Sequence, residues 1–170
     1  LLEWSKIQRG YAIPSPMKVK VNDPTTSAYQ ILKLSLESKN IKFSNYISDK
    51  HFILADKNMV EAIFRNILSN AIKFTPNFGK IELYSERKDK YIYIYIKDNG
   101  VGMNLDIQSK LFKLDKHLTT LGTQNEKGTG LGLIITKEFI HLNRGCLEVD
   151  SIKNQGTTII IKLPEYRDIS

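Results

Sequence analysis

Residues 61–75 read EAIFRNILSNAIKFT, and this stretch predicts a helix with two different faces around which the fold is organised. Apolar residues recur at helical spacing and predict one core-facing stripe: Ile63, Phe64, Ile67, Ala71 and Phe74. Beside that stripe, Asn66, Asn70 and Lys73 recur at the same spacing and line one edge of the helix. Asparagine is a mediocre helix former, so two of them four residues apart suggest a role for their side chains. An ordinary solvated face is the alternative, and this stretch alone leaves it open.

Regular patterns on both sides of this helix predict the rest of the fold. Strands are expected over 17–21, 43–47, 52–55, 80–87, 90–97, 146–151 and 157–163, and helices over 24–39, 104–112 and 128–143. The helix over 24–39 is expected to bury Ala28, Ile31, Leu32, Ser35 and Leu36. The strands 43–47 and 52–55 read as a hairpin-like pair, after which Asp56 caps the organising helix.

The fold class follows from the strand over 90–97 together with the number of helices. In residues 91–96 isoleucines alternate with tyrosines, as in a central strand that helices cover on one side and that is half open on the other. We therefore predict an α/β (α+β) fold. It is a two-layer sandwich with about three helices on one face of a mixed, mostly antiparallel five-stranded sheet, and with a lid.

Length and composition indicate one globular domain, because 170 residues with 41% hydrophobic and 25% charged residues are ordinary values. The net charge of +7 suits a polyanionic ligand, but the lysines are scattered, so nucleic acid is not expected as a partner. Cys146 is alone, which fits a reducing, cytoplasmic compartment. No apolar run is long enough for a membrane span. The start LLEW lacks Met, so we expect a piece of a longer protein, whose membrane anchor would lie elsewhere.

A carboxylate and two glycines follow the strand over 90–97, in the sequence Asp98-Asn99-Gly100-Val101-Gly102. Asn-Gly is a strong hairpin signal, but a two-residue hairpin needs another strand at once, and 104–112 has a helical pattern. A carboxylate at this position can accept a hydrogen bond from the exocyclic amine of adenine, whereas guanine has a carbonyl there. The glycines at 100 and 102 would let the backbone pass close to a flat ring.

A second glycine-rich stretch, GTGLGL over residues 128–133, precedes a helical pattern. Phosphate oxygens can bind the free N–H groups at a helix N-terminus, although alternating glycines are also typical of flexible or closely packed loops. The spacing fits neither the dinucleotide pattern GxGxxG nor the P-loop, because the third glycine comes too early and Lys127 precedes Gly128. The long polar segment 113–127 is expected to be a lid over a bound nucleotide, with ordinary disorder as the alternative.

Four stretches, in order, resemble the N, G1, F and G2 boxes of the catalytic ATP-binding domain of bacterial sensor histidine kinases, a GHKL superfamily domain of the Bergerat-type fold. They are NILSNAIKFT, DNGVGM, LFKLDK and GTGLGL, and the resemblance covers roughly residues 44–164. The start LLEWSKIQ is similar to the end of the second helix of a dimerisation and phosphoacceptor domain. The resemblance thus implies that residues 1–12 end that helix and that residues 13–170 form the catalytic domain.

The resemblance implies ATP and Mg2+ as cofactors and a role for each site residue. Asn70 matches the Mg2+ ligand, and Asn66 and Lys73 match positions that face the phosphates and are the catalytic candidates. Asp98 matches the carboxylate that reads adenine, supported through water by the hydroxyl of Thr158. Phe74 stands where many relatives have Tyr, so a hydroxyl contact is lost. The remaining implied cofactor-binding positions are Gly100, Gly102, Phe112, Gly128, Thr129, Gly130, Leu131 and Gly132.

Asn66 favours a kinase over an ATPase. ATP-hydrolysing relatives have at this position a Glu that activates water, and a neutral amide cannot take that proton. Neutral imidazole is already a nucleophile, so the site suits transfer of the γ-phosphoryl to a histidine. His51, His117 and His141 are not in an acceptor context. The implied partners are therefore the dimerisation and phosphoacceptor domain of the same protein, a response regulator and a second copy in the full-length homodimer. A GHKL ATPase, a serine kinase and a degenerate docking module are the rivals.

Overall fold

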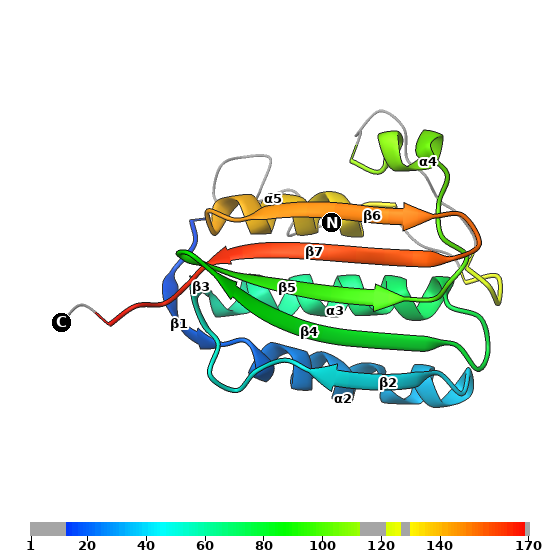
Figure 1. Cartoon of the computed structure of the whole chain (residues 1–170), viewed down its shortest axis with the longest axis horizontal. Coiled ribbons are helices and arrows are strands. Elements are labelled where there is room, and N and C mark those ends of the chain that lie inside the picture. Colours follow the sequence, from blue (N-terminus) through cyan, green and yellow to red (C-terminus); the bar gives the residue numbers. More distant parts are fainter. Residues whose placement is uncertain (1–12, 113–121, 127–129, 169–170) are drawn as a thin grey trace.

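The computed structural model describes residues 13–112, 122–126 and 130–168, and in these ranges it is a two-layer α+β sandwich (Figure 1). The helices are α2 (Asn22–Ser38), α3 (Lys57–Phe74), α4 (Leu105–Lys110) and α5 (Gly132–Leu142). The strands are β1 (Pro16–Lys20), β2 (Lys42–Tyr46), β3 (Phe52–Asp56), β4 (Lys80–Lys88), β5 (Tyr91–Asp98), β6 (Cys146–Ile152) and β7 (Gly156–Pro164). The expected domain boundary at residue 12 lies outside the described residues.

The main sheet has the strand order β2-β4-β5-β7-β6, and β1 pairs with β3 in a separate two-stranded sheet. Only the β2–β4 pair in the main sheet is parallel, and α2, α3 and α5 lie along one face of it (Figure 1). The predicted fold class, with three helices on one face of a mixed, mostly antiparallel five-stranded sheet, is confirmed. In the described ranges no helix has both the length and the apolar character that crossing a membrane requires.

Helix α3 is the centre of the core. It begins at Lys57, directly after Asp56, whose side chain accepts a hydrogen bond from the Met59 amide at 3.0 Å. The prediction that Asp56 caps this helix is therefore confirmed. Its buried residues are Met59, Val60, Ala62, Ile63, Phe64, Ile67, Leu68, Ala71 and Ile72. Four of the five residues of the predicted stripe are buried, but the fifth, Phe74 at the end of the helix, is partly exposed. The buried face is otherwise wider than the predicted stripe because α3 lies between α2 and α5 as well as on the sheet (Figure 1).

Strand β5 runs through the middle of the sheet, as its alternating pattern predicts. Ile92, Ile94 and Ile96 are fully buried under the helices, while the alternate tyrosines are partly exposed on the open face. Tyr84 and Tyr95 stack on that face with ring centroids 4.5 Å apart. This register continues to the end of the strand, so it turns the Asp98 side chain toward the helix layer.

The expected hairpin of 43–47 with 52–55 is wrong. β2 pairs in parallel with β4, and β3 pairs antiparallel with β1 in the smaller sheet. Two strands joined by a short connection need not pair with each other when each of them packs better against another element. Phe43 stacks on Tyr29 of α2 at 5.0 Å, which holds β2 beside α2, while β3 buries Ile53 and Ala55 near α3.

The expected buried stripe of α2 is only partly correct. Ala28 and Leu36 are buried and Leu32 is partly buried, but Ser35 is exposed and Ile31 is 63% exposed. The contact face is rotated toward Tyr29 because that side chain packs on β2, and this rotation carries Ile31 out of the interface.

Candidate functional site

Asp98, the last residue of β5, is a buried carboxyl group with one oxygen left for a ligand. Its Oδ1 accepts hydrogen bonds from the backbone N–H of Gly100 at 2.8 Å and of Thr157 at 3.2 Å. Oδ2 of Asp98 has no hydrogen-bond partner among the described residues. Every buried side-chain oxygen in the described residues does have a partner, so Oδ2 is not buried and reaches the surface. Burial raises the pKa of Asp98 to about 6, although the two N–H bonds act in the opposite direction.

The backbone packs so closely around Asp98 that several positions accept only glycine. A Cβ on Gly100 would meet the carbonyl oxygen of Phe74, and a Cβ on Gly156 would meet that of Asp98. Gly102 and Gly156 also have φ of +59° and +121°, which favour glycine. The Val101 N–H donates to the carbonyl oxygen of Phe74 at 3.0 Å, so the loop after β5 is bound to the C-terminal end of α3.

The residue that supports Asp98 from β7 is Thr157, and the expectation for Thr158 is wrong. Thr157 lies opposite Asp98 in the β5–β7 register, whereas Thr158 lies opposite Lys97. Because side chains alternate along a strand, Thr158 points to the open face of the sheet, away from the carboxyl group. The Thr157 hydroxyl lies 2.8 Å from the Ser151 hydroxyl, and Ser151 accepts from the Met103 N–H at 2.9 Å.

The polar residues of α3 lie along one edge of the helix, as expected, and this edge is accessible to solvent. Asn66, Asn70, Lys73 and Phe74 are all partly exposed. The Asn66 amide lies 3.4 Å from the buried hydroxyl of Thr136 on α5. Lys73 holds its ammonium 4.9 Å from the ring centroid of Phe74. Asn70 makes no hydrogen bond with another described residue, so its amide oxygen is available.

The glycine-rich stretch and the start of the expected lid are described in part. Gly128 and Thr129 lie outside the described residues, and α5 begins at Gly132 rather than at Gly128. Gly130 has a φ of +71°, Leu131 stands at the N-cap without a capping side chain, and the space beside Gly132 is open. Phe112 lies under the ammonium of Lys137 of α5, at 4.7 Å from its ring centroid. Of the expected lid, only residues 122–126 are described.

Four residues near the site are not predicted from the sequence: Thr136, Ser151, Gly156 and Thr157. Thr157 could have been found from the alternation of side chains along a strand. Ile161 and Ile159 are buried on the helix side, so Thr157, two residues before Ile159, lies on that side and Thr158 does not. No comparable signal exists for Ser151 or Thr136, because each reaches the site through packing between distant segments.

The histidines and the acidic residues give no competing site in the described ranges. His51 lies 2.7 Å from the Ser85 hydroxyl, and burial, aided by Arg87, lowers its pKa. His141 is exposed near the end of α5, and His117 lies outside the described residues. No group of three or more His, Cys, Asp or Glu side chains in these ranges could hold a metal ion by itself.

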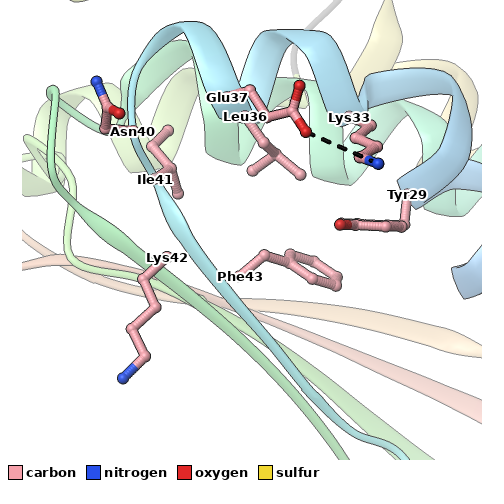
Figure 2. Close-up of a pocket in the computed structure, with 8 residues that line it drawn as sticks. All are labelled: Tyr29, Lys33, Leu36, Glu37, Asn40, Ile41, Lys42 and Phe43. Atoms are coloured by element: carbon pink, nitrogen blue, oxygen red, sulfur yellow. Dashed lines mark ion pairs between the residues drawn. The ribbon is translucent and has the colours of Figure 1, made fainter.

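A pocket of about 400 Å³ lies elsewhere, between α2 and β2 (Figure 2). It contains the Lys33–Glu37 ion pair at 3.8 Å and the stacked rings of Tyr29 and Phe43. None of the predicted site residues lines this pocket. The candidate site is therefore the region where the end of β5, the C-terminal half of α3 and the start of α5 meet.

Known proteins resemble this chain in sequence. The family described as histidine kinase-, DNA gyrase B-, and HSP90-like ATPase matches residues 55–167. A non-motile and phage-resistance protein of Caulobacter vibrioides is 30% identical over 96% of this chain and 20% of its own length. The sensor-like histidine kinase SenX3 of Mycolicibacterium smegmatis is 26% identical over 99% of this chain and 44% of its own length.

Solved structures share the fold. The catalytic domain of the histidine kinase ThkA, in a nucleotide-free form, has a TM-score of 0.76 at 24% identity, covering 89% of this chain and 96% of that one. Full-length ShkA in complex with AMPPNP has a TM-score of 0.80 at 22% identity, covering 99% of this chain and 35% of that one. The chain spans between 16% and 44% of the length of the first curated relatives that it matches.

Proposed function

The chain belongs to the family of histidine kinase-, DNA gyrase B- and HSP90-like ATPases, and on that premise we propose that it binds Mg2+-ATP as the catalytic domain of a sensor histidine kinase. The γ-phosphoryl would be transferred to a histidine on a dimeric helical domain. The observation that carries this proposal is the Asp98 carboxyl group, buried with one oxygen accessible and joined through Gly100 and Val101 to the end of α3.

Asp98 would read the adenine ring. At neutral pH its accessible oxygen accepts a hydrogen bond from an exocyclic amine and repels the carbonyl of guanine. The close backbone contacts of Gly100, Gly102 and Gly156 leave this oxygen in a rigid frame, which favours selectivity because little movement is possible.

The polar edge of α3 would hold the triphosphate. Lys73 supplies a point charge for phosphate oxygens, and Asn66 is held in orientation by Thr136. The amide oxygen of Asn70 suits Mg2+, which usually takes one or two protein oxygens together with phosphates and water. Bound there, the ion would neutralise charge on the transferring phosphoryl group.

Residues around Gly130 and Gly132 would bind phosphate oxygens at the start of α5. Gly130 has a φ of +71° and the space beside Gly132 is open, so the backbone at the start of α5 can come close to a ligand with several acceptor oxygens. Leu131, with Gly128 and Thr129 before it, would complete this loop. Phe112 stands where the lid begins, beside Lys137 of α5.

Transfer to histidine is favoured over hydrolysis because Asn66 cannot act as a general base. We propose further that residues 1–12 end a dimerisation helix, that the full-length protein is a cytoplasmic or membrane-anchored homodimer, and that it passes the phosphoryl group to a response regulator.

Nucleotide selectivity tests the proposal. We expect this chain to bind ATP in calorimetry with Mg2+ present, to bind GTP at least about 100-fold more weakly, and to release ADP slowly by itself. The Asp98→Asn variant should lose ATP binding, whereas Asp150→Asn, an exposed carboxylate on β6, should not. Equal affinities for ATP and GTP would refute the role of Asp98, and steady ADP production would favour an ATPase.

A further inference from the structure

Lys39 is a buried lysine at the C-terminal end of α2. It is 2% exposed, although lysine is almost never fully buried unless its charge is paired. Its ammonium donates to the carbonyl oxygens of Ile72 at 2.9 Å, Lys73 at 3.1 Å and Thr75 at 3.2 Å. These are the last carbonyls of α3, where a cation is favoured by the unpaired oxygens and by the helix dipole. Lys39 therefore caps the end of α3 that carries Lys73.

The same ammonium binds a distant segment, residues 122–126. It lies 2.7 Å from the hydroxyl of Thr123 and 2.7 Å from Oε1 of Glu126. An ammonium has three N–H donors, so the five oxygens around Lys39 share them. Burial raises the pKa of Glu126, but the hydrogen bonds from Lys39 and from backbone amides outweigh it and lower the pKa overall. Glu126 is thus ionised opposite Lys39 at neutral pH.

Residues 122–126 form a compact turn that packs on Lys73. The Gly122 N–H donates to the Glu126 carbonyl oxygen and the Thr123 N–H to the Lys73 carbonyl oxygen, both at 3.0 Å. A Cβ on Gly122 would collide with the Lys73 side chain and with Glu126, so only glycine fits this contact. The turn therefore touches both the backbone and the side chain of the proposed phosphate-binding lysine.

This contact also limits the reach of the chain toward α5. Three residues separate Glu126 from Gly130, and each residue spans at most about 3.6 Å when extended. With Glu126 held at Lys39, one end of that short connection is fixed beside α3, and α5 fixes the other.

We propose that Lys39 is a positioning residue for the phosphate end of the nucleotide site: together with Glu126 and Thr123 it holds residues 122–126 against Lys73. The inference rests on the proposed function and adds to it a group that does not itself touch the nucleotide. It predicts that the ion pair matters for a triphosphate and not for adenosine, which contacts the Asp98 end of the site.

The test compares the Glu126→Gln and Lys39→Met variants with a matched pair on the same helix, Lys33→Met and Glu37→Gln. The Lys33–Glu37 ion pair is exposed and lines the pocket between α2 and β2 (Figure 2). Glu126→Gln preserves size and should fold, because Glu126 is partly exposed. We expect Kd for Mg2+-ATP to rise about tenfold in Glu126→Gln, with Kd for adenosine unchanged within about twofold. Neither control should change either constant.

Two further measurements separate positioning from simple stabilisation. The Thr123 amide, which is bonded to Lys73, should exchange with solvent faster in Glu126→Gln. In Lys39→Met combined with Glu126→Gln, the loss of ATP affinity should be no larger than in Lys39→Met alone, because the two groups act as one unit.

Each other outcome counts against the inference in a defined way. Equal weakening of ATP and adenosine binding would assign the ion pair a purely structural role. Unchanged ATP affinity or unchanged exchange of the Thr123 amide in Glu126→Gln would overturn the positioning role while leaving the proposed function intact. A wild-type chain that bound neither ATP nor adenosine would overturn both.

Discussion

The Asp98→Asn substitution should stabilise the fold at neutral pH while it abolishes nucleotide binding. Asp98 is 7% exposed, and burial raises its pKa from the ordinary 3.8 to about 6. Between pH 3.8 and about pH 6, Asp98 is mostly ionised in the unfolded chain but still mostly protonated in the native state, so the native state binds more protons. The free energy of unfolding therefore falls as pH rises through this window and is constant, as far as Asp98 is concerned, above it.

The magnitude follows from the displacement of the pKa. Each unit corresponds to about 1.4 kcal/mol, so ionised Asp98 costs the fold about 3 kcal/mol above pH 7. Asparagine carries no charge, and its Oδ1 can still accept from the N–H groups of Gly100 and Thr157. Its amide nitrogen takes the place of Oδ2, which reaches the surface, so no donor is buried without a partner. For a chain of 170 residues, about 3 kcal/mol raises Tm by roughly 6–12 °C.

The assay is thermal unfolding of wild type, Asp98→Asn and the control Asp150→Asn from pH 4 to 8, with and without Mg2+-ATP. The Tm difference between Asp98→Asn and wild type should be near zero at pH 4 and reach its full value by pH 7, because only the wild type titrates at this position. Mg2+-ATP should raise the Tm of wild type and control but not of Asp98→Asn. Wild-type ATP affinity should itself fall about tenfold per pH unit below pH 6. An advantage that does not change with pH, or an ATP effect that survives the substitution, would refute the reasoning.

Three further predictions concern α3. Asn70→Ala should remove the Mg2+ dependence of ATP affinity, measured by calorimetry with and without the ion, and an unaltered metal titration would count against the proposed ligand. Asp56→Ala removes the cap on the Met59 amide and should lower the free energy of unfolding by about 1 kcal/mol in urea titration, with no change at all contradicting the cap. Phe64→Ala leaves a cavity at a fully buried position and should cost about 3–5 kcal/mol, and a loss below about 1 kcal/mol would contradict its place in the core.

Elements with strong local patterns could be predicted from the sequence, whereas their partners could not. α3 and β5 each present several apolar residues at one regular spacing, and burial of those residues is enough to specify the element. β2 and β3 also read correctly as strands. The prediction that they pair with each other is wrong, because β2 (Lys42–Tyr46) pairs with β4. That pairing depends on the packing of α2 against β2, through the contact of Tyr29 with Phe43.

The candidate site divides in the same way. Asp98 and the polar edge of α3 are visible in the sequence because a carboxylate after a strong strand, and amides along one edge of a helix, are unusual for structure alone. Thr158 is assigned in place of Thr157 when motif resemblance is used without the strand register, which decides the face of each side chain. Lys39 gives no signal, since a lysine at the end of a helix is normally exposed.

By itself, the sequence determined the fold class, the central helix and strand, and the carboxyl group that is proposed to read the base, because each depends on periodicity or on neighbouring residues. Only the tertiary structure decided which strands pair, which threonine supports Asp98, and that Lys39, Thr123 and Glu126 meet at the end of α3. Those contacts join segments as many as 87 residues apart, as between Lys39 and Glu126. Contacts of this kind depend on how the helix layer packs on the sheet. Burial of the apolar faces of α2, α3 and the sheet brings these polar groups together.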